Sequence, residues 1–465
     1  MATETAPVKI VRPVARALAP ELTPLRALAA VEREPHTLFF ESGGVEGSGA
    51  RWTYLLFDPR YRLEVRGNGL RRVSGREEIP IPGDVMTALA RAWPENVAYE
   101  GGPPLPFRSG LAGFISYDFK DHLERYPSRA RRESLLPDLS LGFYDVAFAW
   151  DRVSGEGWAV STDEARLEEQ LERLEIRAVS PPEAMKPQGR LVSNFTRNEY
   201  LAVVERALEH IAAGDIYQVN LAQRFRLADA PSAPDLYRSL REASPAPFSA
   251  LVTTPSGGIA SSSPERFFAI RGDRIETWPI KGTRPRGATP AEDDALAEAL
   301  ARSAKDRAEN VMIVDLERND LGRVCDIGSV RVRALCEVER FANVQHLVSR
   351  VEGTLRPDAG PPEILRALFP GGSITGAPKI RAVQIIDALE PTRRGPYTGA
   401  IGYWDLSGDA DFNIAIRTIV VEGGAASFHV GGGIVADSTP EGEYEETLVK
   451  ARGMMRALLS ESPRS

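Results

Sequence analysis

Lys281 is a candidate catalytic residue of this sequence. It stands in TWPIKGTRPRG, residues 277–287, where two prolines and two glycines predict a shaped loop rather than a helix or a central strand. A neutral lysine amine is a nucleophile, whereas a lysine beside a glycine is most often a solvated surface charge. The stretch alone leaves both interpretations open.

Two further side chains are candidates for proton transfer near such a lysine. Glu265, in SSSPERFF, is expected at the end of an adjoining strand, where its carboxylate could move protons; an ordinary ion pair is the alternative. His346, in NVQHLVSR, falls in an alternating strand. A neutral histidine within a packed layer is the commoner role there, and contact with a reacting hydroxyl is the other hypothesis.

Four acidic residues form two pairs, each three positions apart on an expected helix. Asp306 and Glu309 share a face in AKDRAENVMIVDL, and Glu443 and Glu446 share one in PEGEYEETLVKARGM. Like charges at this spacing repel mildly, so either solvent or a hard cation should compensate them. Carboxylates suit Mg²⁺, and no His-rich or thiolate set competes. Any metal should therefore be Mg²⁺ rather than zinc.

A glycine-rich turn indicates an anionic ligand. FPGGSITGAPKI, residues 369–380, runs into a helix with Pro378 near its first turn, which directs free N–H groups at an anion. It is not a nucleotide-binding P-loop, because Ala377 and Pro378 follow Gly376 where that motif requires Lys and Ser or Thr.

Two expected strands add to the anion-binding features. DFNIAIRTIVV alternates as one strand, with Arg417 on the face opposite its apolar side chains, where a guanidinium suits a planar carboxylate. HVGGGIV is expected to be a strand that ends in Gly431, Gly432 and Gly433, so that backbone can approach a ligand closely. An ordinary turn and a surface arginine are the alternatives.

The elements that must position these residues predict an α+β fold. Residues 175–192 contain three prolines and no sustained period, and we expect a junction between two halves there. Thr196 and Glu199 then have capping-box spacing, and Gly214 should end the helix that they begin. The later strands alternate cleanly, which favours large antiparallel sheets with helices packed on them.

Composition excludes several classes of protein. The 465 residues carry a net charge of −8 without a long basic run, which argues against nucleic acid as a partner. No apolar run is long enough to span a bilayer, and prolines interrupt the N-terminal region before a signal-peptide core could form. Cys325 and Cys336 are too few for a disulfide framework. A soluble, cytoplasmic protein is expected.

Together, motifs between about residues 190 and 455 resemble those of the chorismate-utilising enzymes, which include anthranilate synthase component I, aminodeoxychorismate synthase component I, and the isochorismate and salicylate synthases. The motifs are GDIYQVNLAQRF, SSSPERF, PIKGTRPRG, ENVMIVDLERNDLGRV, FPGGSITGAPKIRA, GYWDL, DFNIAIRT and GGGIVADSTPEGEYEETLVKA. The resemblance implies an anthranilate-synthase-like sandwich of large antiparallel sheets with helices outside. It also implies an N-terminal domain at 1–186 and a chorismate-binding catalytic domain at 187–465.

Lys281 discriminates within the family that the sequence resembles. Anthranilate synthases typically have PIAGT, whereas PIKGT is typical of the members that aminate chorismate at carbon 4 on the route to p-aminobenzoate and folate. The resemblance therefore implies Mg²⁺-dependent formation of 4-amino-4-deoxychorismate through a covalent Lys281 intermediate. Anthranilate synthase component I with an atypical lysine is the nearest alternative. A non-catalytic subunit that senses chorismate or tryptophan is a second.

The resemblance also assigns roles residue by residue. Lys281 is the nucleophile, Glu265 transfers protons and His346 lies near the leaving hydroxyl. The implied Mg²⁺ ligands are Glu309 and Glu446, with Glu443 and Asp306 as outer or alternate ligands. The implied substrate contacts are Arg417 and Tyr397 at the enolpyruvyl carboxylate, Gly433 and Lys450 nearby, and Ser373 at the ring.

Two further implications concern regulation and partners. Ser42, in LFFESGG, matches the strand motif around which anthranilate synthases bind tryptophan, and a plain core strand is the alternative. No G-x-C-x-G amidotransferase nucleophile exists, because Cys325 lies in GRVCDIG and Cys336 in ALCEVER. The chain should therefore use free ammonia, or glutamine only with a separate glutamine amidotransferase subunit.

Overall fold

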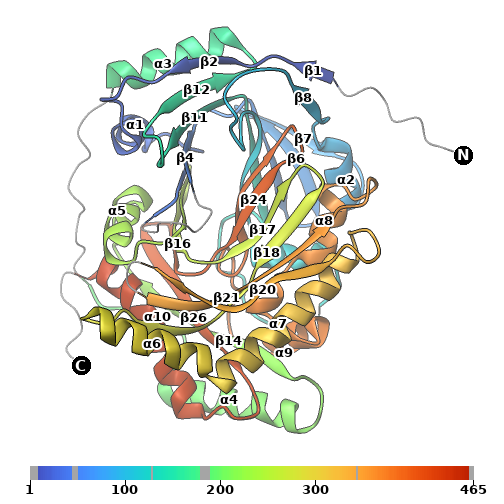
Figure 1. Ribbon diagram of the computed structural model, residues 1–465, viewed down its shortest axis with the longest axis vertical. Helices are drawn as coiled ribbons and strands as arrows, with labels where there is room; N and C mark the ends of the chain where they lie inside the picture. Colours follow the sequence, from blue (N-terminus) through green and yellow to red (C-terminus); the bar gives the residue numbers. More distant parts are fainter. Residues whose placement is uncertain (1–8, 44–50, 127–128, 178–188, 342–343, 460–465) are drawn as a thin grey trace, which may run out of the picture.

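Alternating apolar residues over most of the chain form two large sheets that pack face to face, with helices on the outside (Figure 1). The computed structural model describes residues 9–43, 51–126, 129–177, 189–341 and 344–459. Within each of the two large sheets, the described strands pair in antiparallel fashion, as the sequence predicts. The fold class is therefore confirmed as α+β.

The first sheet has twelve strands. In spatial order they are β19 (Ile280–Pro285), β21 (Val344–Thr354), β18 (Arg274–Trp278), β17 (Arg266–Arg271), β24 (Ala410–Ile414), β23 (Ala400–Asp405), β9 (Gly110–Ile115), β10 (Leu139–Tyr144), β5 (Tyr61–Arg66), β6 (Gly69–Ser74) and β7 (Glu77–Ile81), with β20 (Arg331–Arg340) also paired to β21.

The second sheet also has twelve strands, and a short parallel pair lies apart from both. In spatial order the strands are β13 (Val192–Ser193), β14 (Gln218–Leu227), β26 (Ala425–Ile434), β25 (Thr418–Glu422), β16 (Gly257–Ser263), β15 (Phe248–Thr254), β3 (Leu38–Glu41), β4 (Trp52–Leu56), β11 (Val146–Asp151), β12 (Gly157–Ser161) and β2 (Val14–Ala17), with β22 (Gly376–Ala377) also paired to β14. The parallel pair is β1 (Lys9–Val11) and β8 (Val97–Tyr99).

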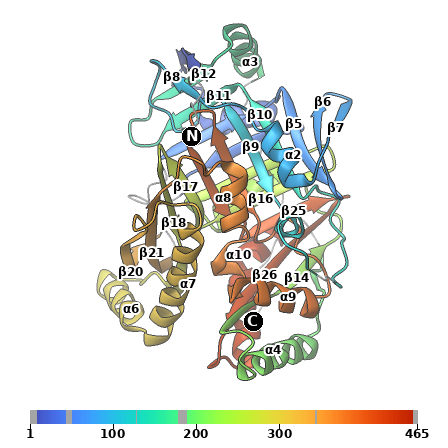
Figure 2. The same cartoon turned by 90° about the vertical axis from the view of Figure 1, so that its right-hand side faces the viewer.

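Helices cover the outer faces and the lower end of the sandwich (Figures 1 and 2). They are α1 (Pro24–Val31), α2 (Val85–Ala92), α3 (Glu164–Arg177), α4 (Arg197–Ala212), α5 (Ala233–Ala243), α6 (Pro290–Arg302), α7 (Ala304–Gly322), α8 (Pro361–Leu368), α9 (Lys379–Leu389) and α10 (Pro440–Leu458), with the 3₁₀ turns η1 (Tyr117–His122) and η2 (Gly372–Ile374). In Figure 2, α6 and α7 lie on one side of the lower end, and α4 and α9 on the other.

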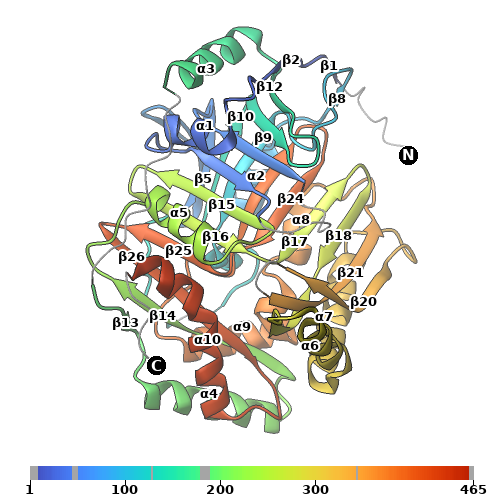
Figure 3. The same ribbon diagram turned by 60° about the vertical axis from the view of Figure 1, so that its left-hand side comes forward.

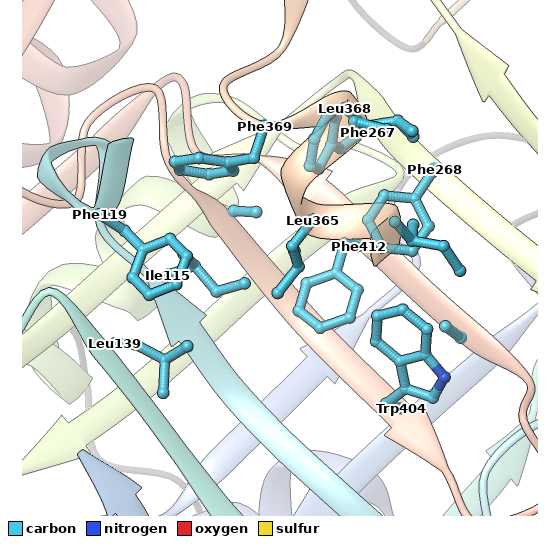
Figure 4. Close-up of a cluster of buried hydrophobic side chains, with 14 of the residues drawn as sticks. Ile115, Phe119, Leu139, Phe267, Phe268, Leu365, Leu368, Phe369, Trp404 and Phe412 are labelled. Carbon is cyan, nitrogen blue, oxygen red and sulfur yellow. The ribbon is translucent and has the colours of Figure 1, made fainter. Parts of the chain in front are cut away.

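Three apolar layers hold this arrangement together. The middle layer joins the inner faces of the two sheets, for example Phe114 of β9 with Ala250 of β15. One outer layer packs α2, α7 and α8 against the first sheet, and Figure 4 shows Leu365 and Leu368 of α8 among its aromatic rings. The other packs α1, α3, α5 and α10 against the second sheet (Figure 3). Burial of these faces is the main stabilising contribution.

Local signals in the sequence place α4 well. The hydroxyl of Thr196 accepts a hydrogen bond from the Glu199 N–H, and the Glu199 carboxylate accepts one from the Thr196 N–H, which completes the predicted capping box. Gly214 follows the end of the helix at φ 77°, a left-handed conformation that glycine adopts without strain.

The single strand expected over residues 411–421 is wrong. The chain leaves the first sheet at Ile414, the end of β24, and enters the second sheet at Thr418, the start of β25. Arg417 lies at this crossing with φ 49°, so it does not belong to the polar face of a strand. The strand of HVGGGIV likewise does not end in its glycines, because β26 continues to Ile434.

The predicted boundary between residues 186 and 187 lies among residues 178–188, outside the described residues. Strands from both sides of that boundary share both sheets: β9 of the N-terminal half pairs with β23, and β3 pairs with β15. The division into two domains stays a prediction. No helix within the described parts of the chain is both long and apolar enough to cross a bilayer.

Candidate active site

Lys281 lies on β19 at the edge of the first sheet, so the predicted loop is wrong. An edge strand tolerates prolines and glycines, and a β-bulge after Lys281 places Gly282 at φ 67°. The half-buried Lys281 donates from Nζ to the Ser373 carbonyl oxygen at 3.4 Å. Burial lowers the pKa of Lys281, although the negative charges of Glu309 and Glu265 oppose this effect. A lowered pKa favours the neutral, nucleophilic amine.

Glu265 precedes β17 and is buried, with 4% of its surface exposed. Its Oε1 atom has no hydrogen-bond partner among the described residues. Burial raises the pKa of Glu265 to about 7, while the positive charge of Lys281 acts in the opposite direction. A carboxyl group with this pKa exchanges protons readily near neutral pH.

Ser373 lies in η2, within the glycine-rich turn that the sequence singled out. Its carbonyl oxygen accepts the bond from Lys281, and its buried hydroxyl has no partner in the described part of the chain. The hydroxyl of Thr375 closes the turn by donating to the Gly371 carbonyl oxygen at 2.8 Å. The turn therefore presents a buried hydroxyl beside the lysine.

His346 lies on β21 opposite Thr283 of β19. Its Nδ1 atom is 3.2 Å from the Gly282 carbonyl oxygen and 3.0 Å from the Thr283 hydroxyl. Burial lowers the pKa of His346 to about 3, and the positive charge of Arg417 contributes. The ring is therefore neutral, and because a carbonyl oxygen can only accept, Nδ1 carries the proton. The buried Nε2 acceptor has no partner among the described residues.

Arg417 is a second basic side chain of the site without an ion pair among the described residues. Its guanidinium makes no ion pair with an acidic side chain that the structure describes, and burial lowers its pKa. The crossing between β24 and β25 holds it through the Arg417 carbonyl oxygen, which accepts from the Ser262 N–H at 3.1 Å. A partly buried guanidinium without a carboxylate partner is suited to bind an anion.

Three more of the predicted substrate residues lie on segments that converge here. Tyr397, in the loop between α9 and β23, is 5% exposed. Gly433 lies on β26 opposite Asn220 of β14. Lys450 of α10 donates from Nζ to the Gly431 carbonyl oxygen at 3.0 Å and pairs with Glu446 at 2.7 Å.

Sequence reasoning missed Gln218, the first residue of β14. Gln218 is fully buried, and neither atom of its side-chain amide has a partner among the described residues. The amide faces Gly433, where an added Cβ would lie 3.1 Å from it. Unpartnered buried amides are unfavourable, which marks Gln218 as a residue that completes its bonds with a ligand. The sequence carries no signal for it, because β14 also contains Asn220, Gln223, Arg224 and Arg226.

The four predicted metal ligands lie on α7 and α10. Glu309 is 3.9 Å from Lys305, and Asp306 pairs with Arg284 at 3.0 Å. Burial raises the pKa of Glu309, and the charge of Glu446 contributes, which indicates that the two carboxylates are near each other. The described residues contain no group of three or more acidic, histidine or cysteine side chains already gathered as metal ligands.

Glu443 and Glu446 nevertheless converge on Gly432 in a way that fits a hard cation. A Cβ at Gly432 would lie 2.9 Å from Oε2 of Glu443 and 3.4 Å from Oε1 of Glu446. Oε2 of Glu443 is buried and lacks a partner within the described residues, while Oε1 accepts from the Ser438 hydroxyl at 2.6 Å. The glycine leaves a space lined by carboxylate oxygens, the ligands that Mg²⁺ prefers.

Ser42 lies in a different region, directly after β3. Its hydroxyl donates to the Trp52 carbonyl oxygen at 2.9 Å. It also lines a cavity between the two sheets that is partly open to solvent. The aromatic residues that line this cavity are Phe40, Trp52, Tyr54, Phe248 and Tyr403. The β3 strand is thus part of the core, and its end opens onto a cavity.

A buried amine, a carboxyl group with a pKa near neutrality, and an unpaired guanidinium define an enzyme site for an anionic substrate. The family model described as chorismate binding enzyme matches residues 52–456. The chain therefore belongs to the chorismate binding enzyme family.

Individual relatives fall into two branches. Aminodeoxychorismate synthase component 1 from Escherichia coli K12 is 44% identical over 425 residues, covering 91% of this chain and 93% of the relative. Anthranilate synthase component 1 1 from Haloarcula marismortui is 39% identical over 442 residues, covering 90% and 88%. The crystal structure of anthranilate synthase component I from Streptococcus pneumoniae superposes with a TM-score of 0.76 at 31% identity, covering 88% and 93%.

Proposed function

We propose that this chain aminates chorismate at carbon 4 to give 4-amino-4-deoxychorismate, with ammonia as the nitrogen source. The observation that carries the proposal is Lys281: its amine is partly buried, has a lowered pKa and lies beside the buried Glu265. Similarity to aminodeoxychorismate synthases over most of the chain supports the same activity.

The proposed reaction consists of two displacements. The neutral amine of Lys281 forms a bond to carbon 2 of chorismate, both ring double bonds shift, and the carbon 4 hydroxyl departs. Ammonia then forms a bond to carbon 4, both double bonds shift back, and Lys281 leaves carbon 2 as the neutral amine, with the proton that the added nitrogen loses. The sum replaces one hydroxyl group by an amino group and releases one water.

Glu265 balances the protons of these steps. Its carboxylate accepts the proton that Lys281 loses on forming the bond to carbon 2, and its acid form donates to the departing hydroxyl. His346 lies across the strand pair with Nε2 as a neutral acceptor, where it orients the hydroxyl without competing for the anionic substrate. Arg417 pairs with the enolpyruvyl carboxylate, next to Tyr397.

Mg²⁺ is proposed as the cofactor, held by Glu309 and Glu446 together with Glu443. Bound there, it would neutralise the ring carboxylate of chorismate as charge shifts during the reaction. Asp306 is already paired with Arg284, so we assign it an outer role. Ammonia would come from a separate glutamine amidotransferase subunit.

The experiment that tests this function is mass analysis of the products formed from chorismate, Mg²⁺ and ammonium, with and without an added aminodeoxychorismate lyase. We expect p-aminobenzoate only when the lyase is present. Anthranilate formed without the lyase would instead assign the chain to the anthranilate synthase branch, which the Haloarcula relative represents.

A second proposal concerns the cavity beside Ser42, which we infer binds tryptophan. Its aromatic lining suits the indole ring of tryptophan. Isothermal titration with tryptophan tests this inference. Absence of binding at millimolar tryptophan would leave the cavity as an unfilled part of the core.

A further inference from the structure

We propose that Arg394 and His429 are positioning residues that contact the ring of Tyr397 and fix the segments around the substrate. This inference rests on the proposed function, because it takes Tyr397 as a contact of the chorismate enolpyruvyl carboxylate. Neither Arg394 nor His429 is expected to touch the substrate.

Arg394 has all five N–H groups in use although it is only 2% exposed. Nε and Nη2 donate to the two carboxylate oxygens of Glu390 at 3.0 and 2.7 Å. Nη2 also donates to the Asn220 carbonyl oxygen at 2.7 Å. Nη1 donates to the Ile374 carbonyl oxygen at 3.1 Å and to the Thr398 hydroxyl at 3.2 Å.

These acceptors belong to three segments that carry proposed substrate contacts. Ile374 follows Ser373 in the glycine-rich turn. Asn220 is the neighbour of Gly433 across β14 and β26. Thr398 follows Tyr397. One guanidinium therefore fixes the relative positions of three segments that lie far apart in the sequence.

The chain at Tyr397 needs such support because the next residue is strained. Thr398 has φ 60°, a left-handed conformation that is unfavourable for a β-branched residue. Its N–H donates to the Ala415 carbonyl oxygen at 2.8 Å, and its hydroxyl accepts from Arg394. Strain of this kind persists only where surrounding contacts impose it.

The ring of Tyr397 is itself held by contacts with both residues. The guanidinium carbon of Arg394 lies 5.7 Å from the Tyr397 ring centroid. His429 of β26 stacks on the ring with centroids 5.1 Å apart and planes at 12°. Burial keeps the pKa of His429 well below its usual value, so its imidazole stacks as a neutral ring. Contacts with both residues thus restrict the orientation of the Tyr397 ring.

The test compares steady-state kinetics of Arg394→Lys, Tyr397→Phe and the double variant with those of the intact chain. Lysine keeps the charge but cannot form the paired bonds to Glu390 or reach all three segments. We expect Arg394→Lys and Tyr397→Phe each to raise KM for chorismate about tenfold. The double variant should raise KM by less than the product of the two single effects, because part of the effect of Arg394→Lys is exerted through Tyr397 and part through the segments of Ile374 and Asn220.

Arg238→Lys is the matched control for a loss of stability alone. Arg238 is also buried and paired with two carboxylates, Glu32 and Asp235, but it lies on α5 away from the site. We expect it to lower the melting temperature about as much as Arg394→Lys while KM stays within twofold. An equal fall in melting temperature with unchanged KM in Arg394→Lys would overturn the proposal, and so would fully additive effects of the two substitutions in the double variant.

His429→Phe and His429→Ala keep the proposal falsifiable if Arg394→Lys fails to fold. Phenylalanine preserves the stacked ring, so KM should stay within twofold, whereas alanine should raise it about fivefold. Equal KM values for both His429 variants would overturn the stacking role. An unchanged KM in Tyr397→Phe would instead refute the proposed substrate contact, which separates failure of the function from failure of the positioning.

Discussion

The site around Lys281 and the cavity beside Ser42 differ in whether their buried polar groups have hydrogen-bond partners. Around Lys281, several buried polar atoms lack partners within the described residues: Oε1 of Glu265, Nε2 of His346, the Ser373 hydroxyl, the Gln218 amide and Oε2 of Glu443. Around Ser42 the polar side chains pair with one another: Arg51 with Asp151, Arg241 with Glu41, and Arg266 with Asp411. The buried polar atoms of the first region are free to form hydrogen bonds with a reactant, whereas the polar side chains of the second region already have partners.

Removal of the nucleophile in the first region should have the largest effect on activity. We expect Lys281→Ala to lower the rate of carbon 4 amination by about 10⁴-fold or more, because the covalent route then lacks the side-chain amine that forms the bond to carbon 2. Mass analysis of the products measures this rate and detects any slow amination at carbon 2. Undiminished 4-amino-4-deoxychorismate formation would remove the covalent mechanism.

Glu265→Gln should lower kcat/KM about 10³-fold and change its pH dependence. The base form of Glu265 is required, so activity of the intact chain should fall as pH drops below the pKa of about 7. Glutamine cannot titrate, and that limb of the pH profile should vanish, whereas Glu265→Asp should retain an acid limb. Persistence of the limb in Glu265→Gln would assign it to another group.

Removal of metal should lower activity about 100-fold, reversibly on adding Mg²⁺. Glu309→Gln should raise the Mg²⁺ concentration needed for half-maximal activity more than Asp306→Asn does, since Asp306 is already paired with Arg284. Activity measured against Mg²⁺ concentration after treatment with EDTA gives both comparisons. Full activity in metal-free buffer would refute the assignment of Glu309 and Glu446.

The smallest effect on activity is expected around Ser42, where the polar side chains already have hydrogen-bond partners. Ser42→Ala removes the hydrogen bond to the Trp52 carbonyl oxygen and should lower the free energy of unfolding by about 1 kcal/mol. Amination with ammonium should stay within twofold. Denaturant unfolding together with the ammonia-dependent assay measures both, and a tenfold loss of activity would show that the two regions are not independent.

Elements defined by local signals could be predicted from the sequence. The cap at Thr196 and the alternation of the strands are properties of neighbouring residues, so α4 and the antiparallel sheets were predicted correctly. The types of the candidate site residues were visible for a similar reason. Lysine, glutamate and arginine beside glycine-rich turns carry their chemistry in the side chain, wherever the fold places them.

Features that depend on contacts distant in the sequence could not be predicted. Arg417 sits where the chain passes from one sheet to the other, and nothing in the alternation of residues 411–421 indicates that crossing. Lys281 is in a strand because β21 pairs with it, despite unfavourable local residues. Gln218 becomes notable only because the fold buries its amide without a partner.

The shared sheets have a consequence for folding during synthesis. In the first sheet β9 must pair with β23, which begins at Ala400, and in the second sheet β16 must pair with β25, which begins at Thr418. Neither sandwich face can close until nearly the whole chain has left the ribosome, and such long-range pairing is slow. The N-terminal strands therefore keep unpaired edges until the C-terminal strands have been synthesised. We expect the nascent chain to depend on chaperones. We also expect an N-terminal fragment to aggregate when it is made alone.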